Sequence, residues 1–269
     1  MDKINKQYIG AMCIIGILLL SIYYTGRLVE IPTVIQSESD WSYEGNIGPM
    51  HWSMLNPNYR LCGKGKQQSP IDIDTHEAKV TKGGGWEIYY EPVLFSVQNN
   101  GHTINVIPES TSNYVVVEGE KYEFKGFHFH TQSEHLLNGQ SFPLEVHFVH
   151  QKQDGAIAVL GVFIKEGAVN KELEAMWKAL PKETGESFMQ IKSLNMRNVL
   201  PDNPQYFSYN GSLTTPPCTE GVQWAVLHQP IELSREQILA YRAVFPDNHR
   251  PVQPPNKREI VNNKLYTYK

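Results

Sequence analysis

Residues 125–135 read KGFHFHTQSEH and place three histidines beside one acidic residue in an aromatic-rich stretch. In a β-strand, side chains two positions apart lie on the same face. His128 and His130 then point to one side, and Phe127 and Phe129 point to the other. The pattern predicts a strand whose phenylalanines enter a hydrophobic core while both imidazoles face a cavity.

A second histidine-bearing strand is expected at residues 144–151, LEVHFVHQ, where Glu145 and His147 share one face. If the two strands are neighbours, His147 joins His128 and His130 in a set of three imidazoles. Three neutral imidazoles suit Zn²⁺ and leave the fourth tetrahedral position open, which is typical of a catalytic site and not of a closed structural one.

Glu145 lies two residues before His147, so its carboxylate can accept the other N–H of that ligand and fix the orientation of the ring. The other two histidines of these segments, His135 and His150, fall outside the predicted set. His150 is expected to be a hydrogen-bonded core residue.

Two other interpretations of the histidines remain open. Histidine pairs are common on the exposed faces of strands, so the pair alone is a weak signal. The segment HFHTQSE, followed by Gly139, also resembles the first motif of the cupin barrels, in which Glu134 would bind iron or manganese. No second cupin motif follows downstream, which counts against that alternative.

The rest of the chain favours a mainly β protein. Its 269 residues are 41% hydrophobic, enough for one large domain. Two short helices are indicated, one capped by Asn170 and one that begins with a capping box of Ser234 and Gln237. Strand-like patterns dominate; they lie at residues 86–91, 94–100, 103–109, 113–119, 122–130, 144–151, 157–165 and 222–231.

The N-terminus is interpreted separately. Lys3 and Lys6 precede twenty uncharged residues that end before Arg27, which indicates a signal peptide or a membrane anchor at residues 1–27. A buried soluble helix is the third alternative. Either favoured reading exports the rest of the chain, to the periplasm, the outer side of the inner membrane or the exterior. Residues 28–40 look like a linker or extended arm, and residues 41–269 show no further boundary.

Charge and cysteine content narrow the classes of partner. The net charge is −4 and no basic patch stands out, so nucleic acid is not an expected partner. A membrane is expected only through the N-terminal segment, if it is not cleaved. Cys62 and Cys218 in an exported chain favour one disulfide over two free buried thiols. Such a bridge would stabilise the fold by roughly 3–5 kcal/mol on the chain-entropy model.

Six motifs in this order resemble the α-class carbonic anhydrases, and the resemblance covers the chain from Trp41 to the C-terminus. The HTQSEH form and the two cysteines are most similar to the exported bacterial members. The motifs are QQSPIDI (67–73), NNGHTINV (99–106), FHFHTQSEH (127–135), LEVHFVH (144–150), GSLTTPPC (211–218) and HRPVQPPNKREI (249–260).

The resemblance implies a twisted, mostly antiparallel sheet of about ten strands with short peripheral helices and the site in a conical cavity. It implies a zinc lyase that reversibly hydrates CO₂ to bicarbonate through zinc-bound hydroxide. His128, His130 and His147 match the zinc ligands of the family, and Cys62 and Cys218 match its disulfide.

The resemblance also assigns roles around the metal. Thr214 matches the threonine that orients the attacking hydroxide, and Glu134 matches the acid that accepts the proton of that threonine in a hydrogen bond. His102 matches the histidine that carries protons to solvent. Thr215 matches a threonine on the substrate side, and five apolar residues match the wall beside the metal by motif position: Val149, Val159, Leu213, Val222 and Trp224.

One position departs from the family pattern. Residue 126 is glycine, where many members have a glutamine that holds the first ligand, so that contact must come from water or another residue, or be absent. Tyr43 is interpreted as a cavity tyrosine.

The alternative function is a catalytically silent, carbonic-anhydrase-like binding domain, but the three histidines, Thr214 and Glu134 are all present and favour an enzyme. The substrate is a small molecule, and a homodimer is left open.

Overall fold

The computed structural model describes residues 40–80, 85–189, 192–201, 205–264 and 266–267. The expectations for residues 1–27 and nearly all of the predicted linker therefore lie outside the described residues. No helix among the residues that the structure does describe is both long enough and apolar enough to cross a bilayer.

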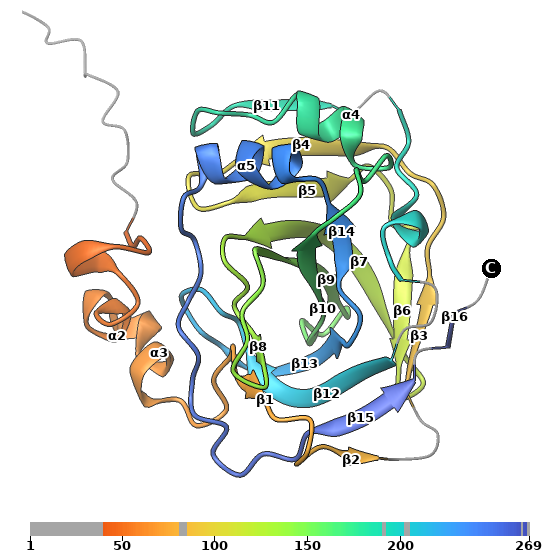
Figure 1. Cartoon of the computed structure of the whole chain (residues 1–269). Helices are drawn as coiled ribbons and strands as arrows, with labels where there is room; N and C mark the ends of the chain where they lie inside the picture. Colours follow the sequence, from red (N-terminus) through yellow and green to blue (C-terminus); the bar gives the residue numbers. More distant parts are fainter. Residues whose placement is uncertain (1–39, 81–84, 190–191, 202–204, 265, 268–269) are drawn as a thin grey trace, which may run out of the picture. The chain divides into compact units, whose positions relative to one another are not determined.

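The domain is built on one large mixed sheet of 14 strands (Figure 1). Ten of them follow one another in the order β11-β4-β5-β7-β9-β10-β13-β12-β15-β2, and β3, β6, β14 and β16 pair beside this path. A separate pair, β1 and β8, is parallel. The bounds are β1 Asp72–Ile73, β2 Lys79–Val80, β3 Trp86–Tyr89, β4 Phe95–Asn99, β5 Ile104–Pro108, β6 Tyr114–Val117, β7 Glu120–His130, β8 Leu136–Leu137, β9 Leu144–Gln151, β10 Ile157–Glu166, β11 Ser187–Met189, β12 Gln205–Ser212, β13 Glu220–Leu227, β14 Ile231–Leu233, β15 Val261–Lys264 and β16 Tyr266–Thr267.

Most neighbouring strands are antiparallel, as the resemblance implied, while β10 runs parallel to β13 and β14. All eight strand-like patterns of the sequence form strands. The strand β12 was missed, because its sequence QYFSYNGS alternates weakly and ends in turn-forming residues.

The central strands β9, β10 and β13 are buried on both faces along most of their length, which explains their apolar runs, and β7 is buried on both faces only toward its C-terminal end. On one face Phe127, Phe129 and Phe148 join the main core. On the other face a second apolar cluster contains Val159, Val222 and Trp224. His128, His130 and His147 lie on this second face, whereas His150 lies on the core face, where its ring contacts the Tyr90 hydroxyl, as predicted for a hydrogen-bonded core residue.

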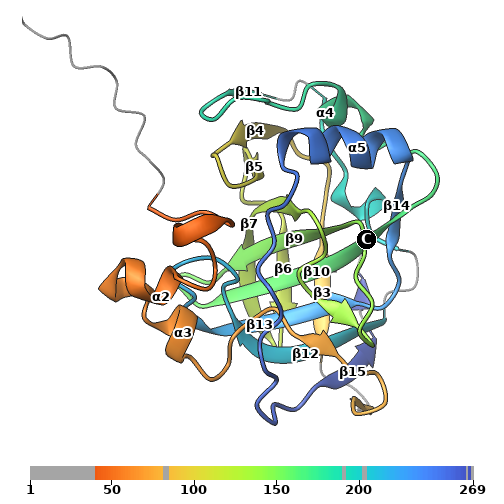
Figure 2. The same ribbon diagram turned by 60° about the vertical axis from the view of Figure 1, so that its left-hand side comes forward.

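Helices are short and lie at the periphery. Both views place α4 and α5 near β4 and β11, and α2 beside α3 at a separate edge of the domain (Figure 1, Figure 2). The predicted capping box of Ser234 and Gln237 opens α5, and Asn170 accepts from the Leu173 N–H. The helices are η1 Gly45–Ile47, α2 Trp52–Leu55, η2 Pro57–Tyr59, α3 Leu61–Lys64, α4 Glu174–Lys178, η3 Met196–Asn198 and α5 Arg235–Val244.

Candidate metal and catalytic site

The register of β7 against β9 brings three imidazoles together. His128 lies directly opposite His147, and His130 lies opposite Glu145. Residues opposite each other in an antiparallel pair share a face, so all four side chains point the same way. One nitrogen from each of His128, His130 and His147 lies within 4.8 Å of the other two. The predicted adjacency of the two strands is therefore correct.

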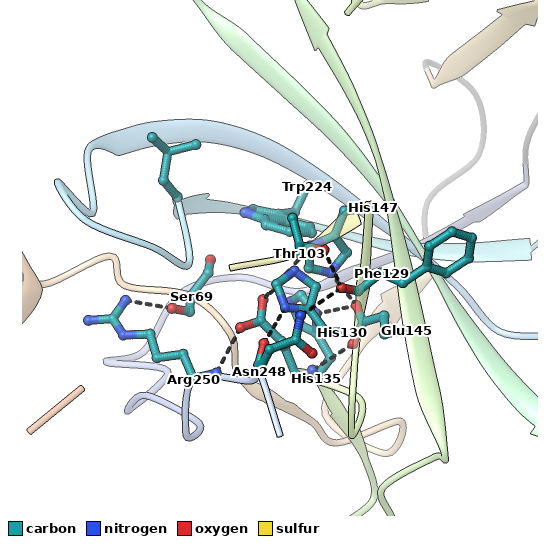
Figure 3. Close-up of polar contacts among 12 residues, drawn as sticks. Ser69, Thr103, Phe129, His130, His135, Glu145, His147, Trp224, Asn248 and Arg250 are labelled. Carbon is teal, nitrogen blue, oxygen red and sulfur yellow. Dashed lines mark hydrogen bonds and ion pairs between the residues drawn. The ribbon is translucent and has the colours of Figure 1, made fainter. Parts of the chain in front are cut away.

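Hydrogen bonds fix which nitrogen of two rings is free (Figure 3). His130 donates from Nδ1 to the Asn248 carbonyl at 2.7 Å, and His147 donates from Nε2 to Glu145 Oε1 at 2.8 Å. The lone pairs therefore sit on His130 Nε2 and His147 Nδ1. These atoms lie 3.5 and 3.8 Å from the same atom, Glu134 Oε2, so both face one small space.

Burial keeps the imidazoles of His128 and His130 neutral. Burial holds the pKa of His128 well below its usual value, and the neighbouring His130 and His147 lower it further. Burial lowers the pKa of His130 to about 3. His130 Nε2 is buried and has no hydrogen-bond partner within the described part of the chain. A neutral imidazole with an unused buried lone pair can bind a metal ion, and the residues present fit Zn²⁺.

Glu145 belongs to a buried chain of hydrogen bonds that continues away from the imidazoles. Its Oε2 accepts from the His135 N–H and its Oε1 contacts His135 Nδ1, each at 2.8 Å. His135 Nε2 contacts the Tyr209 hydroxyl at 2.6 Å, and that hydroxyl contacts Ser69 Oγ at 2.8 Å. Burial favours the neutral acid, but His135 and His147 outweigh it and hold the pKa of Glu145 well below its usual range.

His135 is therefore a functional neighbour that strand parity did not identify. It lies after the end of β7, where alternation along the strand no longer predicts direction. The signal available in the sequence was its place within the HTQSEH motif.

Glu134 is buried beside the imidazoles. Its Oε1 accepts from the Arg250 N–H at 2.8 Å, and its Oε2 has no partner with ordinary hydrogen-bond geometry among the described residues. Burial raises the pKa of Glu134, and the electrostatic effect of the adjacent His147 ring and the nearby Thr214 hydroxyl oppose that rise. The structure thus brings Glu134 and Thr214 close together from distant parts of the sequence.

Arg250 anchors the Glu134 side of the site. Its guanidinium is buried and donates to the carbonyls of Ser69 and Cys62 at 2.7 and 2.8 Å, and to Gln68 Oε1 at 3.0 Å. The side chain of Arg250 therefore fixes the position of the Arg250 backbone N–H, which holds Glu134. Neither Asn248 nor Arg250 was singled out from the sequence, because both act through contacts to the backbone across the fold.

His102 lies at the half-buried edge of the site. Its ring stacks on Trp41 with centroids 3.7 Å apart and an angle of 4°. Burial lowers the pKa of His102 below its ordinary value. Its carbonyl accepts from the Asn248 side chain at 3.0 Å, and the Asn248 carbonyl holds His130, so one residue links His102 to the imidazole set.

The five predicted wall residues fall into one apolar cluster on the imidazole face. Val149, Val159 and Trp224 lie in one row across β9, β10 and β13. The Trp224 ring is 4.9 Å from the His147 ring. Val149, Leu213 and Thr215 are half-buried and form the more open side, while Val159, Val222 and Trp224 are buried.

Gly126 is explained by the backbone. It follows a β-bulge in β7 and has φ of +149°, and a Cβ atom there would lie 2.6 Å from the Val106 carbonyl oxygen. Glutamine therefore does not fit at this position. Within the part of the chain that the structure describes, no side chain hydrogen-bonds the His128 ring in its place. Tyr43 packs in the aromatic group of Trp41 and Trp52.

Comparison with known proteins agrees with this geometry. A family model described as eukaryotic-type carbonic anhydrase matches residues 47–264. A carbonic anhydrase of Nostoc sp. is 38% identical over 227 residues, which cover 82% of this chain and 85% of that protein.

Solved structures are also similar. The α-carbonic anhydrase from Thermovibrio ammonificans, in complex with the inhibitor sulfanilamide, has a TM-score of 0.80 and 47% identity, covering 82% of this chain and 98% of that chain. A dioscorin complexed with ascorbate has a TM-score of 0.79 and 29% identity, covering 84% of this chain and 99% of that chain. The sheet, the opposed histidine strands and these similarities together show that the chain belongs to the eukaryotic-type, or α, carbonic anhydrase family.

Proposed function

We propose that His128, His130 and His147 hold Zn²⁺ and that this centre carries out the activity of the family, the reversible hydration of CO₂ to bicarbonate and a proton. One observation carries the proposal: three imidazole nitrogens lie within 4.8 Å of one another, and two of the rings have their lone pairs freed by named partners. Three histidine ligands leave a fourth position for substrate chemistry.

Zn²⁺ bound here supplies a nucleophile at neutral pH by lowering the pKa of water. The residues of the chain set its direction. Thr214, donating its hydroxyl proton to Glu134, can only accept a hydrogen bond from the attacking group, and this aims a lone pair at the carbon of CO₂. Glu134 is held for this role by the Arg250 N–H.

The apolar row beside His147 suits a substrate without charge. CO₂ is apolar, so Val149, Val159 and Leu213 can hold it without competing for the metal, with Val222 and Trp224 behind them. Thr215 lies half-buried next to Thr214 and offers a polar group on the substrate side.

His102 is proposed to move the product proton from the site to solvent. Its half-buried ring can take a proton on the inner side and release it on the outer side. The lowered pKa keeps the ring a neutral acceptor down to more acidic pH.

A silent binding domain is the alternative function. The similarity to a dioscorin complexed with ascorbate means that the fold alone does not decide between the two. The complete set of His128, His130, His147, Glu134 and Thr214 supports the enzyme.

The location of the enzyme is part of the proposal. Residues 1–27 act as a signal peptide or membrane anchor, and residues 41–269 work outside the cytoplasm, as the uncharged N-terminal run and the disulfide support. A homodimer remains compatible with this assignment.

The test is stopped-flow CO₂ hydration by the purified full chain, with zinc counted on the same sample. We expect one zinc per chain and fast hydration that a sulfonamide inhibits. His147→Ala should lose zinc and activity together, while the control His76→Ala, at an exposed histidine, should keep both. A folded His147→Ala protein that hydrates CO₂ without zinc would end the ligand assignment.

A further inference from the structure

The segment between Glu44 and Asp72 contains no acidic residue, although the whole chain has 28 and a net charge of −4. It carries three basic residues, Arg60, Lys64 and Lys66, and all three are exposed. None of them forms an ion pair within the residues that the structure covers. This edge of the domain is therefore locally cationic.

The same segment exposes large apolar side chains. Met50 and Met54 are 81% and 72% exposed, while Trp52 between them is fully buried. Successive residues of a helical turn are rotated by about 100°, so residues two positions from Trp52 point away from it. Met54, within α2, therefore points away from Trp52, and Met50, two residues before the helix begins, is exposed as well.

Ile47 and Leu61 extend this surface, with 39% and 36% of their side chains exposed. Four of the ten exposed large hydrophobic residues found among the described residues therefore fall within residues 47–61. We call Ile47, Met50, Met54 and Leu61, with their basic neighbours, the methionine face. It lies on the edge of the domain that carries α2 and α3 (Figure 2).

The chemistry of the methionine face matches a lipid surface. Flexible methionines can bury their thioethers among acyl chains, and Lys and Arg reach from the interface to headgroup phosphates. The segment contributes no acidic side chain of its own, which limits repulsion from an anionic headgroup layer; the one carboxylate bound to it among the described residues, that of Glu220 in β13, accepts from the Gln67 N–H.

The position of the face in the chain points to the same occupant. Only residues 27–39 separate the uncharged N-terminal run from Asp40, and thirteen residues can span at most about 45 Å. The methionine face begins seven residues after Asp40. If the run is held in a bilayer, as one form of the proposed function has it, this face is within reach of that bilayer.

We propose that the methionine face docks on an anionic lipid bilayer and orients the domain there. The inference rests on the membrane-anchored form of the proposed function. It also has a consequence for the site: Trp52, under the face, packs edge-on against Trp41 at 5.2 Å, and Trp41 stacks on His102. Docking therefore places the proton-carrying histidine two aromatic rings away from the lipid.

The test measures how fast Met50 and Met54 are oxidised in the full chain. The protein is reconstituted in vesicles of phosphatidylcholine alone, in vesicles with one quarter phosphatidylglycerol, and in detergent. Oxidation of Met50 and Met54 by dilute peroxide is followed by peptide mass spectrometry, with the buried Met176 and Met196 as internal references. We expect at least about fivefold slower oxidation on anionic vesicles, because each basic residue near such a surface contributes about that factor in affinity. High salt should remove the protection.

A charge-reversal variant separates the face from the anchor. Arg60→Glu, Lys64→Glu and Lys66→Glu together should abolish the protection while zinc content and CO₂ hydration stay unchanged. The matched control reverses three exposed lysines of another region, Lys171, Lys178 and Lys182, and should keep the protection.

Three results overturn the proposal. Equal oxidation in detergent and on both kinds of vesicle excludes docking. Protection without lipid that grows with protein concentration assigns the face to a second copy of the chain. A full chain that does not float with anionic vesicles shows no membrane contact at all. None of these readouts requires hydration activity, so failure here is distinguishable from failure of the zinc assignment.

Discussion

Two of the three candidate ligand imidazoles are held through their second nitrogen, each by a different kind of acceptor. His147 donates to the Glu145 carboxylate, and His130 donates to the Asn248 carbonyl. The His128 ring has no such partner among the described residues. A carboxylate raises the basicity of the ring more than a carbonyl does, so His147 is expected to be the strongest ligand of the three.

Glu145→Gln tests this ranking at the level of one atom pair. The amide keeps the shape of the side chain but removes the buried negative charge that orients His147. We expect zinc affinity to fall by about 10- to 100-fold, measured by competition with a chelator. The control Glu123→Gln, on the exposed part of β7, should bind zinc like the unchanged protein. Equal affinities for both variants would mean that the carboxylate does not tune the ligand.

His102→Ala tests the proton path. Turnover in weak buffer should fall on the order of 100-fold, and added imidazole should restore it. The control His249→Ala removes another half-buried imidazole, held by Asp247, and should stay near the original rate. Full activity of His102→Ala in weak buffer would assign the proton to a different group.

The pH dependence follows from the pKa of the same residue. Burial lowers the pKa of His102, so the ring remains unprotonated and able to accept a proton to a lower pH than a free imidazole. We expect the part of the turnover in weak buffer that His102→Ala removes to decline only below pH 6.5, as the ring becomes protonated. An inflection above that value that is present in the original enzyme and absent from His102→Ala would contradict the assignment.

At the scale of elements, the site depends on one strand pair and on the irregularity next to it. The bulge between Phe124 and Gly126 shifts the register of β7 against β9, and from Gly126 onward the pairs run without interruption to His130. A slip of one residue would turn the imidazoles to the core face. The bulge therefore sets which side the ligands occupy.

Gly126→Ala tests the bulge. Its φ of +149° and the Val106 oxygen 2.6 Å from a new Cβ should destabilise the zinc-free protein by about 1–3 kcal/mol in urea unfolding. Gly155→Ala is the matched control, because Gly155 also has positive φ, +91°, but no atom within 4 Å of a new Cβ. Gly155→Ala should lower the free energy of unfolding only by the cost of placing alanine at positive φ, about 1 kcal/mol. Equal losses at both positions would show that the contact with Val106 is relieved.

At the scale of the whole domain, the segment that carries Cys62 is tied to the loop of residues 213–219, which carries Thr214 and Thr215. The disulfide joins Cys62 to Cys218 across 156 residues, and Cys218 donates its N–H to the Thr215 carbonyl. Arg250 binds the Cys62 carbonyl and holds Glu134. The threonines and the acid that orient the chemistry thus share one anchor.

Removing the Cys62–Cys218 disulfide tests the contribution of this anchor to stability. Cys62→Ser with Cys218→Ser should lower the free energy of unfolding by about 3–5 kcal/mol, because the unfolded chain regains the freedom of a long loop. Zinc binding should persist, since β7 and β9 carry the ligands. Cys13→Ser, the control, should unfold like the original chain, and a reductant should destabilise it while leaving the double variant unaffected. Loss of zinc together with the bridge would contradict this division.

The sequence by itself determined eight of the strands, the parity of the histidines and the set of candidate ligands. These depend on local alternation and on residue type, so β7 and β9 could be predicted with His128, His130 and His147 on one face. The ordered motifs added Thr214, Glu134 and His102. The strand β12 was missed because its alternation is weak.

Only the tertiary structure decided how those residues are held. The links from His135 to Glu145, from Asn248 to His130 and from Arg250 to Glu134 join positions 10 to 118 residues apart. Such contacts leave no periodic pattern, because they depend on where loops meet and on backbone N–H and C=O groups that every residue carries. The same reason explains Gly126, whose requirement for glycine comes from the Val106 carbonyl on a neighbouring strand.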